Sequence, residues 1–563
     1  MKTFARLALI ALAATLALPG NALAGKIYAD TVLKGGKILT ADKRFSVAQA
    51  VAIREGRFLA VGRTADIATF IGPNTKVIDL DGKTAVPGLM DTHTHFRAAG
   101  EALVRVNLKD AKTVQEALNI LRDFAAKQKP GQWIAGAAWH PLSQLAEKRN
   151  LTRLELDSVA PNNPVYLVTV GHSSMANSLA FKVAGITKDT PNPEGGVIEK
   201  GPDGELNGSL VASALGLVAK HVPPYSTDEL SDQFLKSMQI LNTYGLTSTV
   251  DGGLTIEEMH ALHRLSKTGK QTMRVAALYR PERVPTNLAE WERLMKADGP
   301  TTGFGDEWMR LAGVKLVIDG GMTLRTARTI EPYPDDKHFH GVAYVTPEHF
   351  RKLIRIADKY DWRVAVHTVG DLASQEALDA FEDLNKDSPI AGKRFVLIHA
   401  SLLQRSQMQQ AKRLGVRLDP QNVFMWDKAA TVERFLGADR ANRAVALRSM
   451  IEIMGIENVS GGTDFPANLI NPFVNMYIMV TRKDPRGVVY GKDESVTREQ
   501  ALRMYTSSGP YYTFEEKLKG SIEPGKLADL AILSDDFMTV PEERIKDIRV
   551  LTTIVGGKVV YQR

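Results

Sequence analysis

The sequence predicts an α/β protein: a (β/α)8 TIM barrel, a small β-sandwich domain built from both termini, and an insertion in the barrel. The middle of the chain alternates apolar strands with amphipathic helices, which is typical of βα units. Both ends consist of short strands separated by turns. The chain has 563 residues, which is too long for one simple core.

Residues 1–24 have the features of a secretory signal peptide. Lys2 and Arg6 form a basic start, an apolar run follows at 7–18, and the small-residue pattern A-L-A ends the segment. The alternative is a membrane anchor, but the apolar run falls short of the roughly 20 residues that a spanning helix needs. We therefore expect cleavage, no membrane span in the mature chain, and a bacterial protein of the periplasm or the exterior.

Composition narrows the classes of function. Hydrophobic residues make up 44% of the chain and charged residues 24%, as in ordinary globular proteins. The net charge is +7, and no run of Lys and Arg is interleaved with aromatic residues, so nucleic-acid binding is not indicated. The chain has no cysteine, so any metal must be held by His, Asp, Glu or a modified Lys.

Both ends of the chain are rich in predicted strands. The N-terminal strands are expected at 31–40, 48–53, 57–61 and 76–80, and the C-terminal strands at 527–534 and 550–561. We expect 25–85 and 510–563 to form one composite β-sandwich. The alternative is two unrelated β-segments.

Residues 86–509 are the predicted barrel. Capping-box patterns at Thr113 and Ser226 begin two helices, and Thr346-Pro347 begins a third. About nine strand candidates lie between 85 and 465, and a barrel has eight, so at least one belongs to an insertion. Pro, Gly and Asn cluster at 130–225, where we expect that insertion.

Metal-competent or charged residues occur in the predicted barrel strands or at their ends. They are His93, His95, Lys315, His367, His399 and Asp464. Alternate residues of a strand share a face, so His93 and His95 should point the same way, and neighbouring imidazoles suit a divalent metal. A barrel builds its active site at the C-terminal ends of its strands, so all six should meet in one mouth. Taken singly, Lys315 could instead extend to solvent, and the others could be loop or turn residues.

These motifs resemble the metal-dependent amidohydrolase superfamily. The resemblance is closer to its amidohydrolase 3 branch, which includes proteins like N-substituted formamide deformylase and exoenzyme regulatory proteins. The matching residues are 87–95, Gly171-His172, Asn177-Ser178, Lys315, Asp319-Gly320-Gly321, His367, His399, Gly462-Thr463-Asp464 and 522–530. The resemblance covers nearly the whole mature chain and is specific for the superfamily, but it is weak for the substrate.

The resemblance implies a centre of one or two divalent ions, with zinc expected. The first two histidines and Asp464 would hold one ion, and the two later histidines would hold the second. Lys315, carboxylated by CO2, would bridge the pair, although some members keep a single metal. A lysine buried in an apolar strand is more readily neutral, which favours this reaction.

The resemblance further implies hydrolysis of a C–N bond in a small molecule such as an amide, formamide, cyclic imide or N-acyl compound. The metal would make water acidic enough to ionise near neutral pH. Asp464 would take the proton and deliver it to the leaving nitrogen. His172, which follows a predicted strand at 165–170, would bind substrate or stabilise an oxyanion; the alternative is a structural loop histidine.

Several other residues keep two interpretations. Asp319 could shape the pocket or form a turn, and Trp139, Tyr333 and Trp426 could line the pocket or pack in the core. The family often has Gly-Trp-Asp near residue 139, where this chain has Ala138-Trp139-His140. Two other functions also stay open: a binding or regulatory protein on a hydrolase scaffold, and a non-hydrolytic metal-dependent lyase or isomerase. A homo-oligomer is compatible with the sequence.

Overall fold

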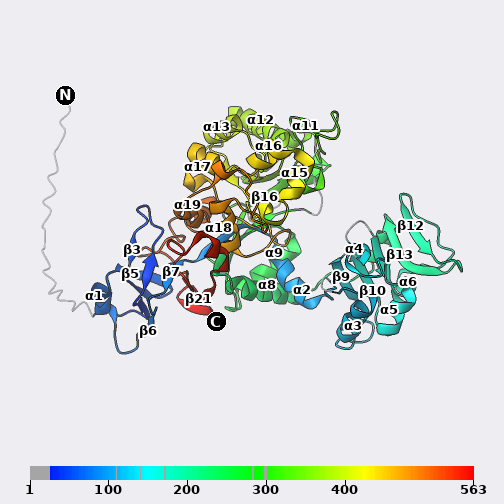
Figure 1. Ribbon diagram of the computed structural model, residues 1–563, viewed down its shortest axis with the longest axis horizontal. Coiled ribbons are helices and arrows are strands. Elements are labelled where there is room, and N and C mark those ends of the chain that lie inside the picture. The colour runs from blue at the N-terminus through cyan, green and yellow to red at the C-terminus, as the bar shows by residue number, and fades with distance from the viewer. Residues whose placement is uncertain (1–25, 109–110, 140, 170–172, 282–284, 297–300) are drawn as a thin grey trace, which may run out of the picture.

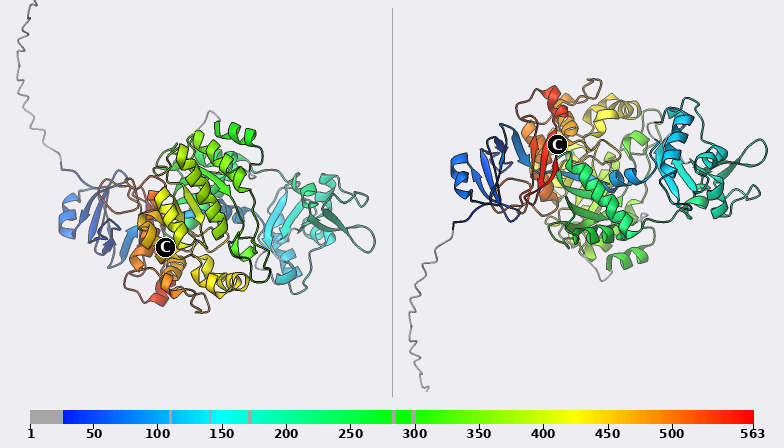
Figure 2. Two further views of the ribbon diagram at one scale, coloured as in Figure 1. Left: turned by 90° about the horizontal axis from the view of Figure 1, so that it is seen from above. Right: turned by 90° about the horizontal axis from the view of Figure 1, so that it is seen from below.

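A central barrel lies between two β-rich regions that occupy opposite ends of the molecule (Figures 1 and 2). The computed structural model describes residues 26–108, 111–139, 141–169, 173–281, 285–296 and 301–563. The predicted signal peptide lies outside these ranges. Every helix within them is too short or too polar to span a bilayer.

Parallel strands form the barrel wall in the order β19-β18-β17-β16-β15-β14-β8. Their bounds are β8 (Leu89–Thr94), β14 (Leu246–Leu254), β15 (Arg274–Tyr279), β16 (Met309–Val317), β17 (Val364–Thr368), β18 (Val396–His399) and β19 (Arg417–Asp419). Residues 459–465 occupy the eighth position, because Val459 bridges to Leu418 of β19 and Phe465 bridges to Thr94 of β8. The predicted barrel is confirmed, and its last segment closes the ring without forming a regular strand.

Helices cover the outside of the barrel and include two whose starts were predicted. Ser226 and Glu229 form a capping box at the start of α8, and Pro347 is the first residue of α11. The helices that follow the barrel strands are α2 (Arg97–Val104), α8 (Thr227–Asn242), α9 (Ile256–Ser266), α10 (Leu288–Lys296), α11 (Pro347–Lys359), α12 (Asp371–Asp387), α13 (Arg405–Leu414) and α17 (Leu447–Met454). Helices of the last third include α14 (Phe424–Asp427), α15 (Ala429–Leu436), α16 (Ala438–Arg443), α18 (Pro472–Thr481) and α19 (Arg498–Met504).

The interior of the barrel is a packed core. Its residues are Met90, Val250, Ala276, Leu278, Ala312, Ala365, Val396, Ile398 and Tyr512. Tyr512 ends α20 (Ser508–Tyr512), which packs against β8. The space for a ligand therefore lies at the C-terminal ends of the strands.

Both termini contribute to the sheets beside the barrel. One sheet has the order β5-β4-β1-β6, and the other has the order β22-β21-β20-β7-β2-β3. Their strands are β1 (Thr31–Lys34), β2 (Lys37–Leu39), β3 (Val47–Ala48), β4 (Ala50–Arg54), β5 (Arg57–Gly62), β6 (Lys76–Asp79), β7 (Thr84–Pro87), β20 (Leu530–Leu533), β21 (Val550–Val555) and β22 (Lys558–Gln562). Strand β20 pairs antiparallel with β7, so the C-terminal strands complete an N-terminal sheet. A buried ion pair between Asp529 and Arg274 of β15, with contacts of 2.8 and 3.1 Å, joins this sheet to the barrel.

The insertion lies between β8 and β14 and has a sheet of its own, in the order β12-β13-β11-β10-β9. Its elements are α3 (Val114–Ala125), β9 (Ile134–Trp139), α4 (Pro141–Gln144), α5 (Arg153–Val159), β10 (Val165–Thr169), β11 (Ser173–Ala176), α6 (Ser178–Ala184), β12 (Gly196–Lys200), β13 (Leu206–Ala212) and α7 (Leu215–Ala219). Leu121 of α3 shares a core with Ile134 and Leu167, and the same core includes Val106. The core of this module therefore reaches further back along the chain than residue 130.

Candidate metal centre

The C-terminal ends of the barrel strands surround a cavity of about 450 Å³. The six residues singled out from the barrel strands all line it: His93, His95, Lys315, His367, His399 and Asp464. Residues separated by some 370 positions of sequence are therefore brought to one place. This is the face of a barrel that carries active sites.

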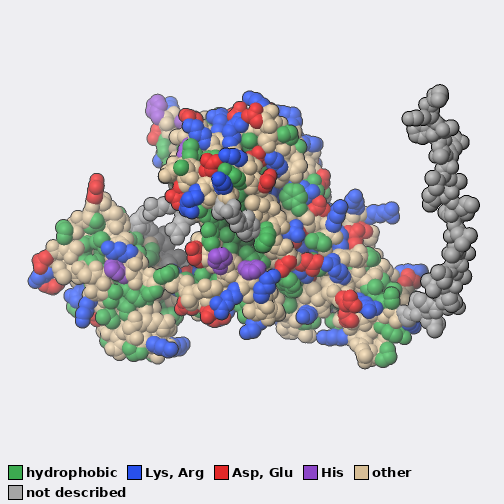
Figure 3. All heavy atoms as spheres, turned by 180° about the vertical axis from the view of Figure 1, so that it is seen from behind, with side chains coloured by type: hydrophobic (Ala, Val, Ile, Leu, Met, Phe, Trp, Pro, Cys, Tyr) green, Lys and Arg blue, Asp and Glu red, His purple; other side chains and the backbone are tan. Residues whose placement is uncertain are grey.

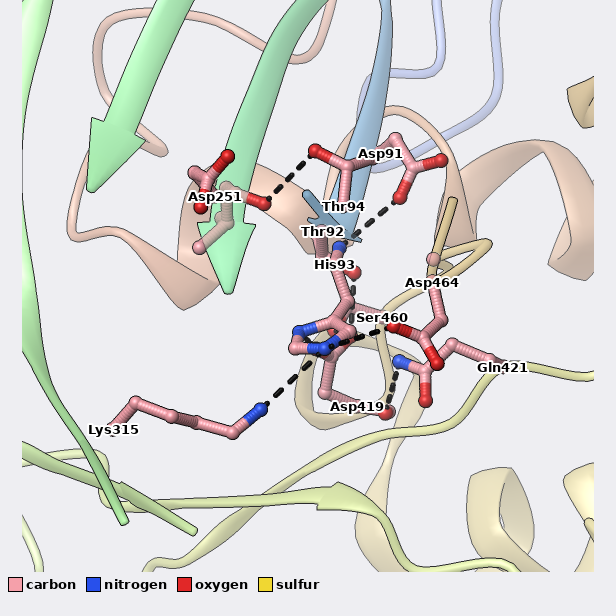
Figure 4. Close-up of polar contacts among 12 residues, drawn as sticks. Asp91, Thr92, His93, Thr94, Asp251, Lys315, Asp419, Gln421, Ser460 and Asp464 are labelled. Carbon is pink, nitrogen blue, oxygen red and sulfur yellow. Dashed lines mark hydrogen bonds and ion pairs between the residues drawn. The ribbon is translucent and has the colours of Figure 1, made fainter. Parts of the chain in front are cut away.

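His93, His95 and Asp464 form the tightest group of donors. One donor atom from each lies within 4.8 Å of the other two. The Oδ1 atom of Asp464 is 3.5 Å from Nε2 of His93 and 3.7 Å from Nε2 of His95. Figure 4 shows the carboxylate of Asp464 and the amine of Lys315 both turned toward the His93 ring. Two imidazoles and a carboxylate are donors that zinc and similar divalent ions accept.

The two later histidines lie beside this group. The ring of His399 is 5.2 Å from the ring of His93 and 4.3 Å from that of His367, measured between centroids. The Nζ atom of Lys315 is 3.5 Å from Nε2 of His93. Lys315 is only 4% exposed, so its amine belongs to the buried cluster and does not extend to bulk solvent.

Burial controls the protonation of these groups. Removal from water, with a smaller contribution from the charge of Lys315, lowers the pKa of His95 and of His367 to about 3. Burial also lowers the pKa of Lys315 to about 7, against the opposing effect of Asp464. It raises the pKa of Asp464 to about 7, against the opposing effect of Lys315. At neutral pH the imidazoles are therefore neutral, which is the form that binds a metal.

A buried carboxylate lies behind His93. Asp419 Oδ2 is 3.9 Å from Nδ1 of His93, and neither atom has a hydrogen-bond partner among the described residues. The other oxygen of Asp419 accepts hydrogen bonds from Thr92 and Ser460 at 2.5 and 2.8 Å, which fixes the carboxylate. Metal-binding histidines usually direct their second ring nitrogen at a carboxylate of this kind. The donors around the cavity therefore fit a divalent cation.

The backbone is shaped around these side chains. The residues His399 and Asp464 have φ angles of 70° and 57°, in the left-handed region that Asn, Asp and His adopt more often than other L residues. Asp91 accepts hydrogen bonds from the backbone N–H groups of His93 and Thr463, at 3.1 and 3.0 Å, and so ties β8 to the closing segment. At Gly252 of β14, a Cβ atom would lie 2.4 Å from Cε1 of His93, so only glycine leaves room for the ring.

Asp319 shapes the cavity and is more than a turn residue. Its buried carboxylate accepts backbone N–H groups of Arg328, Val369 and Gly370 at 2.8 to 2.9 Å. It also lies 4.0 Å from Nε2 of His367. These contacts join the loops that follow β16 and β17.

Of the remaining predicted positions, those that the structure describes do not line the cavity. His172 is outside the described residues, and the strands on either side of it, β10 and β11, belong to the insertion sheet. Tyr333 is a core residue whose hydroxyl donates to the carbonyl of Ala327 at 2.9 Å. Trp426 packs against the core and against the ring of Tyr477. The side chain of Trp139 also lies outside the described part.

The site also contains residues that were not singled out from the sequence, and two of them lie at the ends of barrel strands. Asp419 is the last residue of β19, and Arg280, which lines the cavity, directly follows β15. Each has the signal that identified the other residues, a charged group at the end of an apolar strand. That signal is common in the chain, and only the closed barrel separates these two from other strand-end charges.

Comparisons with known proteins agree with this architecture. The model of the Amidohydrolase family matches residues 76–561. Protein LONG AFTER FAR-RED 3 of Arabidopsis thaliana is 31% identical over 548 residues, which cover 95% of this chain and 92% of that protein. N-substituted formamide deformylase of Arthrobacter pascens is 30% identical over 549 residues, which cover 95% and 98%.

A solved structure has the same fold. It is an uncharacterized metal-dependent hydrolase of Pyrococcus furiosus, with a TM-score of 0.74 and 26% identity, covering 90% of this chain and 100% of that one. The family match covers most of the chain, and the barrel and its mouth agree with it. The chain therefore belongs to the Amidohydrolase family.

Proposed function

We propose that this protein is an exported metal-dependent amidohydrolase that hydrolyses a C–N bond of a small molecule. The bond is that of an amide, formamide, cyclic imide or N-acyl compound. One observation carries the proposal: donor atoms of His93, His95 and Asp464 lie within 4.8 Å of one another at the mouth of the barrel. The similarity to a formamide deformylase supports the type of bond. The signal-peptide pattern at 1–24 supports export to the periplasm or the exterior.

The proposed ligand sets use the groups around the cavity. His93, His95 and Asp464 would hold one divalent ion, and His367 and His399 would hold a second, with carboxylated Lys315 as a further anionic ligand. Zinc suits this set of imidazole and carboxylate donors. A cavity of about 450 Å³ is the size of a typical small-molecule site.

The protein contributes a proton carrier to the reaction. A bound divalent ion supplies an acidified water and polarises the substrate carbonyl. Asp464 takes the proton of the attacking water and returns it to the leaving nitrogen. In the metal-free protein, burial raises the pKa of Asp464 above that of an exposed aspartate, which suits a carboxylate that takes up a proton. His172 is proposed to bind the substrate or to stabilise the oxyanion.

The test is a panel of formamides, N-acyl amino acids and cyclic imides, incubated with the zinc-loaded mature protein in isotopically labelled water. Hydrolysis places solvent oxygen in the product. We expect Asp464→Asn to lower kcat by about 10² to 10⁴-fold while the fold stays intact. The matched control is Asp439→Asn, at an exposed aspartate of α16, which should retain full activity.

Other outcomes contradict the proposal and separate the alternatives. A product without solvent oxygen would indicate a lyase or isomerase. A protein that holds no stoichiometric metal and cleaves no member of the panel would indicate a binding or regulatory protein. Near-normal turnover of Asp464→Asn would remove Asp464 from the mechanism.

A further inference from the structure

Arg280 places a positive charge in the wall of the candidate metal cavity. It directly follows β15 and its side chain lines the cavity. Among the residues that the structure describes, its guanidinium group makes neither a hydrogen bond nor an ion pair. The aliphatic part of the Arg280 side chain lies over Gly253, where a Cβ atom would be 2.6 Å from Cδ of Arg280. The close approach to glycine lets the chain carry a long cationic side chain past β14.

The other charged groups of the cavity wall are already engaged. Lys428 forms an ion pair with Asp427 at 3.0 Å and donates to Asn468 at 2.6 Å. Asp319 accepts three backbone N–H groups, as described above. Lys315 and Asp464 face His93. In the described part of the wall, Arg280 is the cation that is left for a ligand.

Apolar side chains lie beside this charge. Strand β16 is the neighbour of β15 in the wall, and the loop that follows it supplies Met322 and Leu324. Leu324 is 71% exposed and Tyr344 is 51% exposed, although both line the cavity. Phe424 follows β19, which lies four strands from β15, and so lines the cavity from the side opposite Arg280. The described part of the mouth thus offers the Arg280 cation next to apolar side chains.

We propose that the substrate carries a carboxylate that binds Arg280, and that its class is the N-acyl or N-formyl derivatives of apolar amino acids. Such a compound combines an anion, an apolar side chain and a C–N bond within one small molecule. Arginine matches a carboxylate with two parallel hydrogen bonds, which fix orientation as well as charge. The inference rests on the proposed function, because the C–N bond must lie at the metal while the carboxylate lies at Arg280.

The test compares substrates that differ only in the carboxylate. N-formyl-phenylalanine is paired with N-formyl-phenethylamine, and N-acetyl-leucine with N-acetyl-isopentylamine, using both enantiomers of each amino acid. In the zinc-loaded mature protein, kcat/KM should favour the carboxylate by about 10 to 100-fold, as expected for a hydrogen-bonded charge. Arg280→Gln should abolish this ratio, and Arg280→Lys should restore part of it. The control is Arg264→Gln at an exposed position of α9, which should keep the ratio.

A binding measurement separates this inference from the proposed function. Calorimetry with 3-phenylpropionate should give about tenfold or more weaker binding to Arg280→Gln than to the wild type at equal zinc content. That difference would support the inference even if no compound of the panel is hydrolysed, an outcome that counts against the proposed function alone. Equal kcat/KM for both members of each pair, or equal binding by wild type and Arg280→Gln, would overturn the inference.

Discussion

Carboxylation of Lys315 is the prediction that depends most directly on the geometry of the site. Burial lowers the pKa of this lysine to about 7, against 10.5 for an exposed lysine. At pH 7 about half of the Lys315 amine is therefore neutral, compared with about 0.03% of an ordinary lysine. The reactive form is more abundant by a factor on the order of a thousand. We predict that Lys315 takes up CO2 at neutral pH, where exposed lysines do not.

The assay is a nuclear magnetic resonance spectrum of zinc-loaded protein in isotopically labelled bicarbonate. We expect one carbamate signal per chain, which grows between pH 6 and 8 as the Lys315 amine loses its proton. The signal should be absent in Lys315→Arg and unchanged in Lys352→Arg, at an exposed lysine of α11. A spectrum without any signal that depends on Lys315, at saturating bicarbonate, would refute the reasoning.

Three further predictions concern the surroundings of the site. Asp419→Asn should weaken zinc binding by about 10 to 100-fold in a chelator competition, because the carboxylate 3.9 Å from Nδ1 of His93 no longer orients the ring; unchanged affinity would contradict this. Burial lowers the pKa of His367 to about 3, so between pH 6.5 and 3 the unfolded chain binds one more proton there than the folded chain. As the pH falls below 6.5, the metal-free wild type should therefore lose about 1.4 kcal/mol of stability per pH unit relative to His367→Gln, as measured by urea unfolding. A difference in stability that does not change with pH would argue against a neutral buried imidazole. Asp529→Ala should lower the free energy of unfolding by about 3–5 kcal/mol, because it leaves the buried Arg274 unpaired, and a loss below about 1 kcal/mol would show that the pair is not needed.

The sequence was sufficient to predict the barrel and six of the residues that line its mouth. Strands that end in His or Asp, alternating with amphipathic helices, leave few other arrangements, because the barrel gathers all strand ends on one face. The closing segment was harder to predict. Its sequence is typical of a strand, but it pairs with its neighbours through isolated bridges at Val459 and Phe465, and Asp464 has a positive φ that a regular strand does not have.

Residues that act through long-range contacts could not be predicted. Asp419 lies behind His93 although 326 positions separate them, and nothing in the local sequence indicates that proximity. Arg280 stands out only once the folded chain places its side chain in the cavity wall, where no described residue pairs with it. The core of the insertion reaches back to Val106, which bridges to Gly136 of β9, and it includes the apolar face of α3. The helical pattern of α3 alone is equally typical of a barrel helix.

The central claim is that side chains from distant strands jointly hold a divalent ion at the mouth of the barrel. Its most direct test is the metal content of the purified mature protein after equilibration with zinc and removal of free metal. We expect one or two zinc ions per chain in the wild type, a clear loss in His95→Ala, and no loss in His260→Ala, whose histidine is exposed on α9. A wild type without stoichiometric metal, or a His95→Ala variant that holds as much zinc as the wild type, would contradict the claim.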